Sequence, residues 1–160
     1  MGHEVLAITE HDTVASAVKA LKYYRKVKEK NPNFKLILGN EIYLVRDGLT
    51  NENYQSGVDK YYHFILLAKD ETGHRQIREI STKAWMRSYM ARGMRRVPTY
   101  YEDLFEIIGK NPGHVIGSTA CLGGAIPTQL MKWRDSGYDA GAYKNICGWL
   151  ETMKELFGEG

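Results

Sequence analysis

The chain has 160 residues, of which 43% are hydrophobic and 26% charged, and its net charge is +3. This composition predicts one globular domain over residues 1–160, excludes a disordered or fibrous protein, and permits a polyanionic partner without requiring one. The longest strongly apolar run, residues 64–68, is far shorter than the roughly 20 residues that a membrane-spanning helix needs, so no membrane partner is expected. Two cysteines, Cys121 and Cys147, are too few for a disulfide framework and are typical of a reducing compartment, which predicts a cytoplasmic location.

Short β-rich runs alternate with amphipathic helical stretches along the chain. Asn31 and Pro32 mark the end of the first helix, in which apolar residues recur with a spacing close to 3.6. In chain order, the pattern predicts a strand over residues 4–9, a helix over 13–30, strands over 35–45 and 60–69, a helix over 72–90 followed by a basic turn to Pro98, a helix from Thr99, a strand over 113–118, and helices over 124–132 and 139–157. Alternation of this kind predicts an α/β fold.

The second and third predicted strands flank a loop over residues 46–59 that is rich in Gly, Asn and Asp. We expect these strands to form a long antiparallel hairpin closed by this loop. Glu41 lies midway along the second strand, and His63 comes just before the apolar part of the third. Because facing residues of antiparallel strands are about 5 Å apart, the hairpin predicts that Glu41 and His63 lie side by side on one face.

Four side chains that can bind a metal ion lie at or beside predicted strands: His11, Glu41, His63 and Cys121. His11 follows the first strand, and ligands gather at the carboxyl ends of strands in α/β folds. Cys121 follows the strand over 113–118, in a segment of small residues that lets the backbone approach a ligand. Each of the four has an ordinary alternative. These are a surface or capping histidine for His11, a solvent-facing carboxylate for Glu41, a histidine bonded to a strand carbonyl for His63, and a buried inert thiol for Cys121. Together they are acceptable zinc or manganese ligands, but their spacing matches no zinc-finger signature, so only the fold could assemble a shared site.

Residues 74–96 carry seven basic residues against one acid, with Trp85, Tyr89 and Met90 between them. The basic residues are Arg75, Arg78, Lys83, Arg87, Arg92, Arg95 and Arg96. Such a stripe predicts contact with the phosphate backbone of DNA, and each contact would add salt dependence to binding. The alternatives are a solvated helix face with a basic loop, and a surface that docks onto an acidic neighbouring domain.

Four strings of the sequence resemble successive motifs of the polymerase-and-histidinol-phosphatase (PHP) domain family: VLAITEHDTVASAV, LILGNEIYL, DKYYHFILLAKDETG and STACLGGAIP. They are most similar to the version at the amino terminus of bacterial replicative DNA polymerase III α subunits, and YYHFILLAKDETG and ACLGGAIP are the most specific parts. The resemblance covers residues 2–157. It implies a distorted (β/α) barrel that gathers up to three metal ions, usually zinc or manganese, in a cleft.

By this resemblance, the metal ligands are His11, Glu41, His63 and Cys121. The motif around His11 usually reads Thr-Asp-His-Gly in the family, whereas here it reads Thr-Glu-His-Asp. Glu10 therefore lies where a carboxylate could orient His11, and Asp12 replaces a turn glycine.

Family members also carry a His-x-His motif on the first strand and an Asp-x-His motif on a late strand, and neither motif occurs in this sequence. The resemblance therefore implies an internal fragment, a single incomplete PHP domain over residues 1–160. It would lack the first and last strands of the barrel, and the palm, fingers and thumb of a polymerase. Unpaired strand edges would then favour self-association.

Three functions are compatible with this resemblance. The first is a metal-dependent phosphoesterase or 3′–5′ exonuclease-type module of a replicative polymerase, inactive in isolation, with DNA and the remaining parts of the polymerase as partners. The second is a non-catalytic module that stabilises the polymerase or docks a partner. The third is a free-standing phosphatase of the same family, against which the polymerase-type strings argue.

Overall fold

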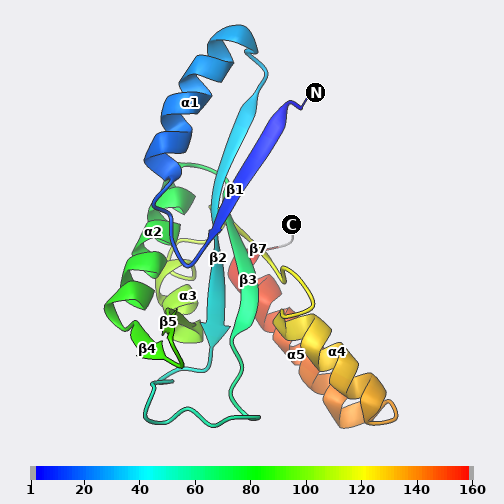
Figure 1. Ribbon diagram of the computed structural model, residues 1–160. Helices are drawn as coiled ribbons and strands as arrows, with labels where there is room; N and C mark the ends of the chain where they lie inside the picture. The colour runs from blue at the N-terminus through cyan, green and yellow to red at the C-terminus, as the bar shows by residue number, and fades with distance from the viewer. Residues whose placement is uncertain (1–2, 159–160) are drawn as a thin grey trace.

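Two antiparallel strands, β2 (Lys35–Val45) and β3 (Tyr62–Ala68), form the centre of the fold in the computed structural model, which describes residues 3–158 (Figure 1). Three further strands extend this pair: β1 (Val5–His11) and β6 (Pro98–Tyr100) run parallel to β2 along its other side, and β7 (Val115–Ser118) pairs antiparallel with β3. Across the described residues the sheet is open, with β1 and β7 as its outer strands. The predicted α/β class is confirmed, whereas the described strands form no closed barrel.

The alternation of side chains along β2 and β3 gives the sheet two different faces. One face presents four buried apolar side chains, Ile42, Leu44, Phe64 and Leu66. The opposite face presents Glu41, Tyr43 and His63. Because a shift of one residue in register would exchange the two faces, burial of the apolar set also fixes where the polar set lies.

Three helices cover the apolar face: α2 (Glu71–Met86), α3 (Tyr101–Ile107) and the C-terminal part of α5 (Ala140–Phe157). Buried apolar residues of α2, including Ile77, Ile80 and Ala84, recur at helical spacing and form its inner stripe. The Phe64 ring packs against Phe157 of α5, with ring centres 5.7 Å apart. These contacts form one core between the helices and the sheet.

The other two helices of the described chain contribute little to this core. α4 (Ala125–Asp135) forms a helical hairpin with α5, and this hairpin projects from the sheet (Figure 1). α1 (Ala17–Lys30) connects β1 to β2 as a parallel crossover and buries Ala17. Between residues 3 and 158, no helix is long and apolar enough to cross a membrane.

The segment after α2 differs from the prediction. The helix predicted over residues 72–90 ends at Met86, and the predicted basic turn is a short hairpin of β4 (Tyr89–Ala91) and β5 (Met94–Arg96). Arg92 and Gly93 connect the two strands with φ values of 50° and 77°. Positive φ at both central residues is what a type I′ turn requires, and glycine adopts it without steric cost. The hairpin therefore replaces the last turn of the predicted helix.

The predicted helix over residues 13–30 starts late, after Ser16. The Glu10 carboxylate accepts a hydrogen bond from the backbone N–H of Ser16 at 2.9 Å. The Asn40 side-chain amide donates to the carbonyl oxygens of Glu10 and Thr13 at 2.8 and 2.9 Å. These hydrogen bonds hold the loop after β1 in a non-helical conformation.

Candidate metal centre

Three strands bring His11, Glu41 and His63 to one face of the sheet. His11 is the last residue of β1 and pairs with Glu41 across the parallel β1–β2 ladder. His63 pairs with Tyr43, two residues beyond Glu41 on β2, and lies diagonally across from Glu41 on the same face. The predicted placement of Glu41 and His63 side by side on one face of a hairpin is therefore confirmed.

The Glu41 carboxylate lies between the two imidazoles. Its Oε1 accepts a hydrogen bond from Nδ1 of His63 at 2.7 Å, and its Oε2 lies 3.5 Å from Nε2 of His11. One potential ligand atom from each of the three residues lies within 4.8 Å of the other two. The Glu41 side chain is 16% exposed and has two polar partners, so the alternative of a solvent-facing carboxylate is wrong.

This donor set fits a divalent ion such as zinc or manganese. Imidazole nitrogens and a carboxylate are ligands that both metals accept. The His11 side chain is 58% exposed, so one side of the cluster is open to solvent. Three protein donors beside an open position are typical of catalytic zinc sites, whereas structural zinc sites are closed by four protein ligands.

Asp12 follows His11 and was expected only to replace a turn glycine. Its φ of 60° lies in the left-handed region that favours glycine. Its backbone N–H donates to the carbonyl of Glu41 at 2.8 Å, and its own carbonyl accepts from the indole N–H of Trp85 at 2.6 Å. The backbone at Asp12 is therefore held on both sides, which compensates for its conformation.

The Asp12 side chain adds a fourth carboxylate or imidazole group to this region. Its Oδ1 is buried and has no hydrogen-bond partner among the described residues. Burial raises the pKa of Asp12 to about 6, while the nearby charges of His11 and His63 act in the opposite direction. A buried carboxylate oxygen without a partner, close to two imidazoles, is consistent with a cation bound at this place. In the sequence, the only sign that Asp12 belongs to this site is that its carboxylate directly follows the candidate ligand His11.

Tyr43 forms a wall of the site that the sequence reasoning missed. Its ring centre lies 4.8 Å from that of His63 in an edge arrangement and 6.0 Å from that of His11 in a stacked one. Burial raises the pKa of the Tyr43 phenol, and the neighbouring Asp12 and Glu41 raise it further. Tyr43 lies two residues from Glu41 on the same strand. Because side chains two residues apart on a strand share a face, the sequence pattern is enough to predict that Tyr43 lies on the face of Glu41.

Cys121 lies beside the three-residue cluster but outside it. The residue is exposed in the loop between β7 and α4, and its Sγ accepts a hydrogen bond from the N–H of Gly123 at 3.4 Å. The same loop packs on His63, whose backbone N–H donates to the carbonyl of Gly123 at 3.1 Å. A Cβ at Gly123 would lie 3.0 Å from the His63 ring, so glycine allows this close approach. The structure thus brings together three of the four predicted ligands and holds the loop of the fourth against one of them.

Glu10 has a different partner from the one expected. Its carboxylate accepts from the backbone N–H of Ser16, as described above, and thereby shapes the loop that follows His11. Among the described residues, this carboxylate bonds to the backbone of that loop and not to the His11 ring.

Two of the basic residues of 74–96 pair with acids of α3. Arg87 forms a two-pronged ion pair with Asp103, in which Nη2 donates to Oδ1 at 2.9 Å. Lys83 pairs with Glu106 and lies 3.7 Å from Asp103. Asp103 is only 1% exposed, so the two cations compensate a buried charge.

The other basic residues lie closer to solvent. Arg95 lies over the Trp85 ring, and Arg96 lies over the Tyr61 ring at 5.1 Å from its centre. Arg75, Arg78 and Arg92 are exposed. The predicted stripe is therefore divided between α2 and the β4–β5 hairpin.

Comparison with known proteins identifies the class to which this fold and cluster belong. The PHP domain family matches residues 1–160, and the chain belongs to this family. The predicted family is thereby confirmed.

Several curated DNA polymerases are similar to the chain. It is 44% identical over 137 residues to the probable DNA polymerase YorL of Bacillus subtilis, a match that covers 82% of this chain and 10% of the relative. It is 29% identical over 134 residues to the DNA polymerase III subunit alpha of Treponema pallidum, covering 84% of the chain and 10% of the relative. It is 26% identical over 165 residues to that of Aquifex aeolicus, covering 99% of the chain and 12% of the relative. The chain thus spans about a tenth of the length of the curated relatives that it matches.

Proposed function

We propose that this chain is the metal-binding portion of the PHP domain of a bacterial-type replicative DNA polymerase, a phosphoesterase module of the 3′–5′ exonuclease type that serves DNA replication in the cytoplasm. The observation that carries this proposal is the convergence of donor atoms from His11, Glu41 and His63 in a chain of the PHP family. The names of its relatives are those of DNA polymerases, which supports a phosphodiester as the substrate class and DNA and the rest of a polymerase as partners.

Each residue of the cluster has a role in this proposal. His11, Glu41 and His63 would hold one zinc or manganese ion. The Oδ1 atom of Asp12, which has no hydrogen-bond partner among the described residues, is available as a further metal ligand. An ion held by these residues would polarise a phosphodiester and would lower the pKa of a coordinated water to roughly 7. The Tyr43 phenol, whose pKa is raised by burial, keeps its proton at neutral pH and can donate a hydrogen bond to a phosphate oxygen.

We propose further that residues 1–160 form one incomplete PHP domain whose open sheet is a segment of a distorted (β/α) barrel. β1 and β6 run parallel to β2, and α2 and α3 cover the face opposite Glu41 and His63. In a barrel of parallel strands, helices lie outside and the site lies at the carboxyl end of the strands. His11, the last residue of β1, has that position.

Metal binding by the purified 160-residue chain tests the proposed function. We expect about one equivalent of zinc or manganese to bind, measured by calorimetry, because the described donors suit a single ion. The His11→Ala/His63→Ala double variant should lose this binding. His3→Ala is the matched control, because His3 is exposed and lies outside the cluster. Equal binding by the wild type and the double variant would overturn the site.

Catalysis is a separate readout. Since one ion cannot reproduce a cluster of three, we expect the isolated chain to release few nucleotides from labelled single-stranded DNA in manganese. Clear manganese-dependent release that is lost in the double variant would contradict this expectation and support the site.

A non-catalytic role is the second candidate, and one observation favours it. Glu41 joins the imidazoles of β1 and β3 directly, so the cluster already connects the strands. In this case a chelator lowers the melting temperature while no turnover is detected with or without metal. The third candidate, a free-standing phosphatase, would require preferential hydrolysis of small phosphomonoesters over DNA.

A further inference from the structure

A cavity of about 250 Å³ lies between the β2–β3 loop and the β4–β5 hairpin, away from the candidate metal centre. Its chemistry comes from three tyrosines and two arginines, namely Tyr54, Tyr61, Tyr89, Arg92 and Arg96. None of these residues belongs to the three-residue metal cluster. The volume is just below the roughly 300–1,000 Å³ of pockets that take drug-sized ligands, which suits a ligand about the size of one nucleotide.

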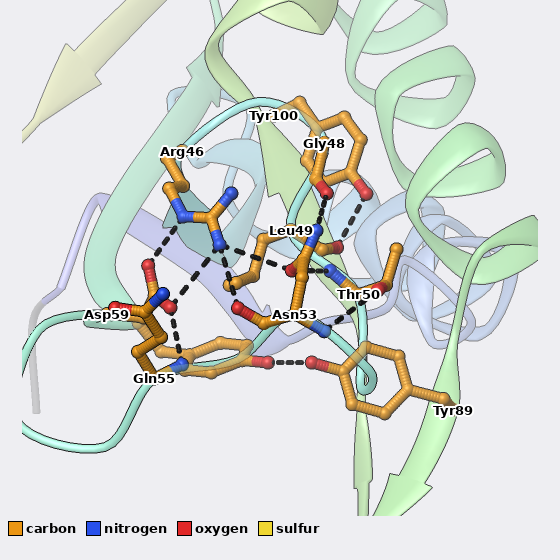
Figure 2. Close-up of polar contacts among 10 residues, drawn as sticks. Arg46, Gly48, Leu49, Thr50, Asn53, Gln55, Asp59, Tyr89 and Tyr100 are labelled. Atoms are coloured by element: carbon orange, nitrogen blue, oxygen red, sulfur yellow. Dashed lines mark hydrogen bonds and ion pairs between the residues drawn. The ribbon is translucent and has the colours of Figure 1, made fainter.

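The loop that forms one side of the cavity is held by its own polar contacts (Figure 2). Arg46 bonds to Asp59 at 2.6 Å and to the carbonyl of Asn53 at 3.0 Å. The Tyr100 hydroxyl donates to the carbonyl of Leu49 at 2.6 Å. Because these contacts fix the loop, the cavity is formed before any ligand enters, which lowers the entropic cost of binding.

The two sides of the cavity are joined by tyrosine hydroxyls. Tyr61, directly before β3, and Tyr89 of β4 share a hydrogen bond between their hydroxyl groups, and the Tyr89 hydroxyl points toward the loop in Figure 2. The Tyr54 and Tyr61 rings lie 6.2 Å apart. The guanidinium of Arg96 lies 5.1 Å from the centre of the Tyr61 ring.

The charged side chains that line the cavity favour an anionic ligand. Over residues 3–158, the cavity is lined by two arginines and by no acidic side chain. Guanidinium groups bind phosphate through paired hydrogen bonds, and tyrosine rings offer flat faces on which a nucleobase can stack. Aromatic rings combined with basic side chains are typical of proteins that bind single-stranded nucleic acids.

A chain of aromatic rings leads from the cavity to the metal cluster. The Tyr61 ring centre is 6.3 Å from that of Tyr43, which is 4.8 Å from that of His63. We propose that this tyrosine–arginine cavity binds one nucleotide unit of a single-stranded nucleic acid, with its base on the tyrosine rings and its phosphate on Arg92 and Arg96. This inference rests on the proposed function, because the strand would then continue toward His63 and the candidate metal centre.

Binding of a single-stranded oligonucleotide of eight thymidine nucleotides to the full chain tests the proposal. The measurement is fluorescence anisotropy of the labelled oligonucleotide in the presence of a chelator, so that metal plays no part. We expect Tyr54→Leu to weaken binding about tenfold, which corresponds to the loss of one base–aromatic stack. Tyr23→Leu is the matched control and should change binding less than about twofold, because Tyr23 is an exposed tyrosine on α1.

Charge is tested in the same way. Arg92→Gln should weaken binding and reduce its salt dependence, whereas Arg25→Gln removes the same charge from an exposed position on α1 and should have little effect. Equal losses in the two arginine variants would show general attraction to a basic surface and would overturn the proposal. No loss in Tyr54→Leu would overturn it as well.

Competition identifies the ligand chemistry. Displacement of the oligonucleotide by thymidine monophosphate, and not by inorganic phosphate at the same concentration, would support recognition of a complete nucleotide unit. Equal displacement by both would overturn the base-stacking part of the proposal. The His11→Ala/His63→Ala variant separates the two hypotheses: retained oligonucleotide binding with lost metal binding supports both sites. Metal binding by the wild type without oligonucleotide binding overturns the nucleotide site alone.

Discussion

Glu41 is the residue on which the candidate metal centre depends, because its carboxylate contacts His11 on β1 and His63 on β3. It is the central donor of the three and the least exposed among them. Asp12 and Tyr43 support the same site from a loop and from β2. A small change at Glu41 should therefore affect the metal and leave most of the core in place.

The first prediction concerns Glu41→Gln. The amide keeps the shape of the side chain and removes its negative charge, so we expect the affinity for zinc to fall by more than about 100-fold, since changes outside the ligand shell already cost 10–100-fold. Titration against a competing chromophoric chelator measures this affinity. Glu52→Gln, in the exposed part of the β2–β3 loop, is the control and should bind as the wild type does. An unchanged affinity in Glu41→Gln would exclude Glu41 as a ligand.

The second prediction concerns Arg87, which was expected to contact DNA. Its guanidinium pairs with Asp103, which is buried, and this hydrogen bond raises the pKa of Arg87. Arg87→Met leaves the carboxylate without its main partner, so we expect the free energy of unfolding to fall by about 3–5 kcal/mol in urea denaturation. Arg75→Met, at an exposed position of the same helix, should change it by less than about 0.5 kcal/mol. A similarly small change in the free energy of unfolding of both variants would contradict this prediction. Arg87 would then again be a candidate for contact with DNA.

At the scale of elements, the β2–β3 loop contains an ion pair between Arg46 and Asp59, with Nε of Arg46 2.6 Å from Oδ1 of Asp59. The hydrogen bond from Arg46, followed by that from the backbone N–H of Gln55, holds the pKa of Asp59 below its ordinary value of 3.8. A carboxylate with a lowered pKa stabilises the folded state above its ordinary pKa, and this contribution is lost as the pH falls through the folded-state value.

The third prediction follows from the lowered pKa of Asp59. The urea midpoint of the wild type should fall more steeply than that of Asp59→Asn as the pH is lowered from about 5 to about 2, because only the wild type loses the charged Asp59. The difference between the two proteins should be constant above this range. Parallel curves throughout would show that the ion pair contributes nothing to stability.

At the scale of the whole molecule, the open sheet and the exposed apolar residues predict self-association. β1 is an outer strand of the described sheet, and its Val5 and Leu6 are half exposed. The neighbouring helix α1 exposes Val18 and Leu21. An unpaired strand beside apolar surface is a template for pairing with another chain.

The fourth prediction is that the sedimentation coefficient of the purified chain increases with concentration. Leu6→Lys should shift the protein toward monomer, because a lysine on an edge strand opposes strand addition. Leu122→Lys, on an exposed loop next to the metal cluster, should not. A clean monomer of the wild type at high concentration would contradict the prediction.

The elements and the candidate ligand types could be predicted because they depend on local patterns. Along β2, the alternation of Ile42 and Leu44 with Glu41 and Tyr43 is a property of any strand, so the sequence predicts which side chains share a face. The β4–β5 hairpin was missed because Arg92 in a left-handed conformation carries no strong sequence signal, and because the predicted helix before it extends to Met90.

The sequence by itself determined the α/β class, the family, and four candidate ligands, His11, Glu41, His63 and Cys121. Only the tertiary structure decided that the donor atoms of the first three converge, that Asp12 leaves a buried oxygen beside them, and that Arg87 is occupied by Asp103. The physical reason is distance along the chain: periodicity acts over a few residues. The positions of His11, Glu41 and His63 relative to one another depend on strand register, which the buried apolar core fixes as a whole.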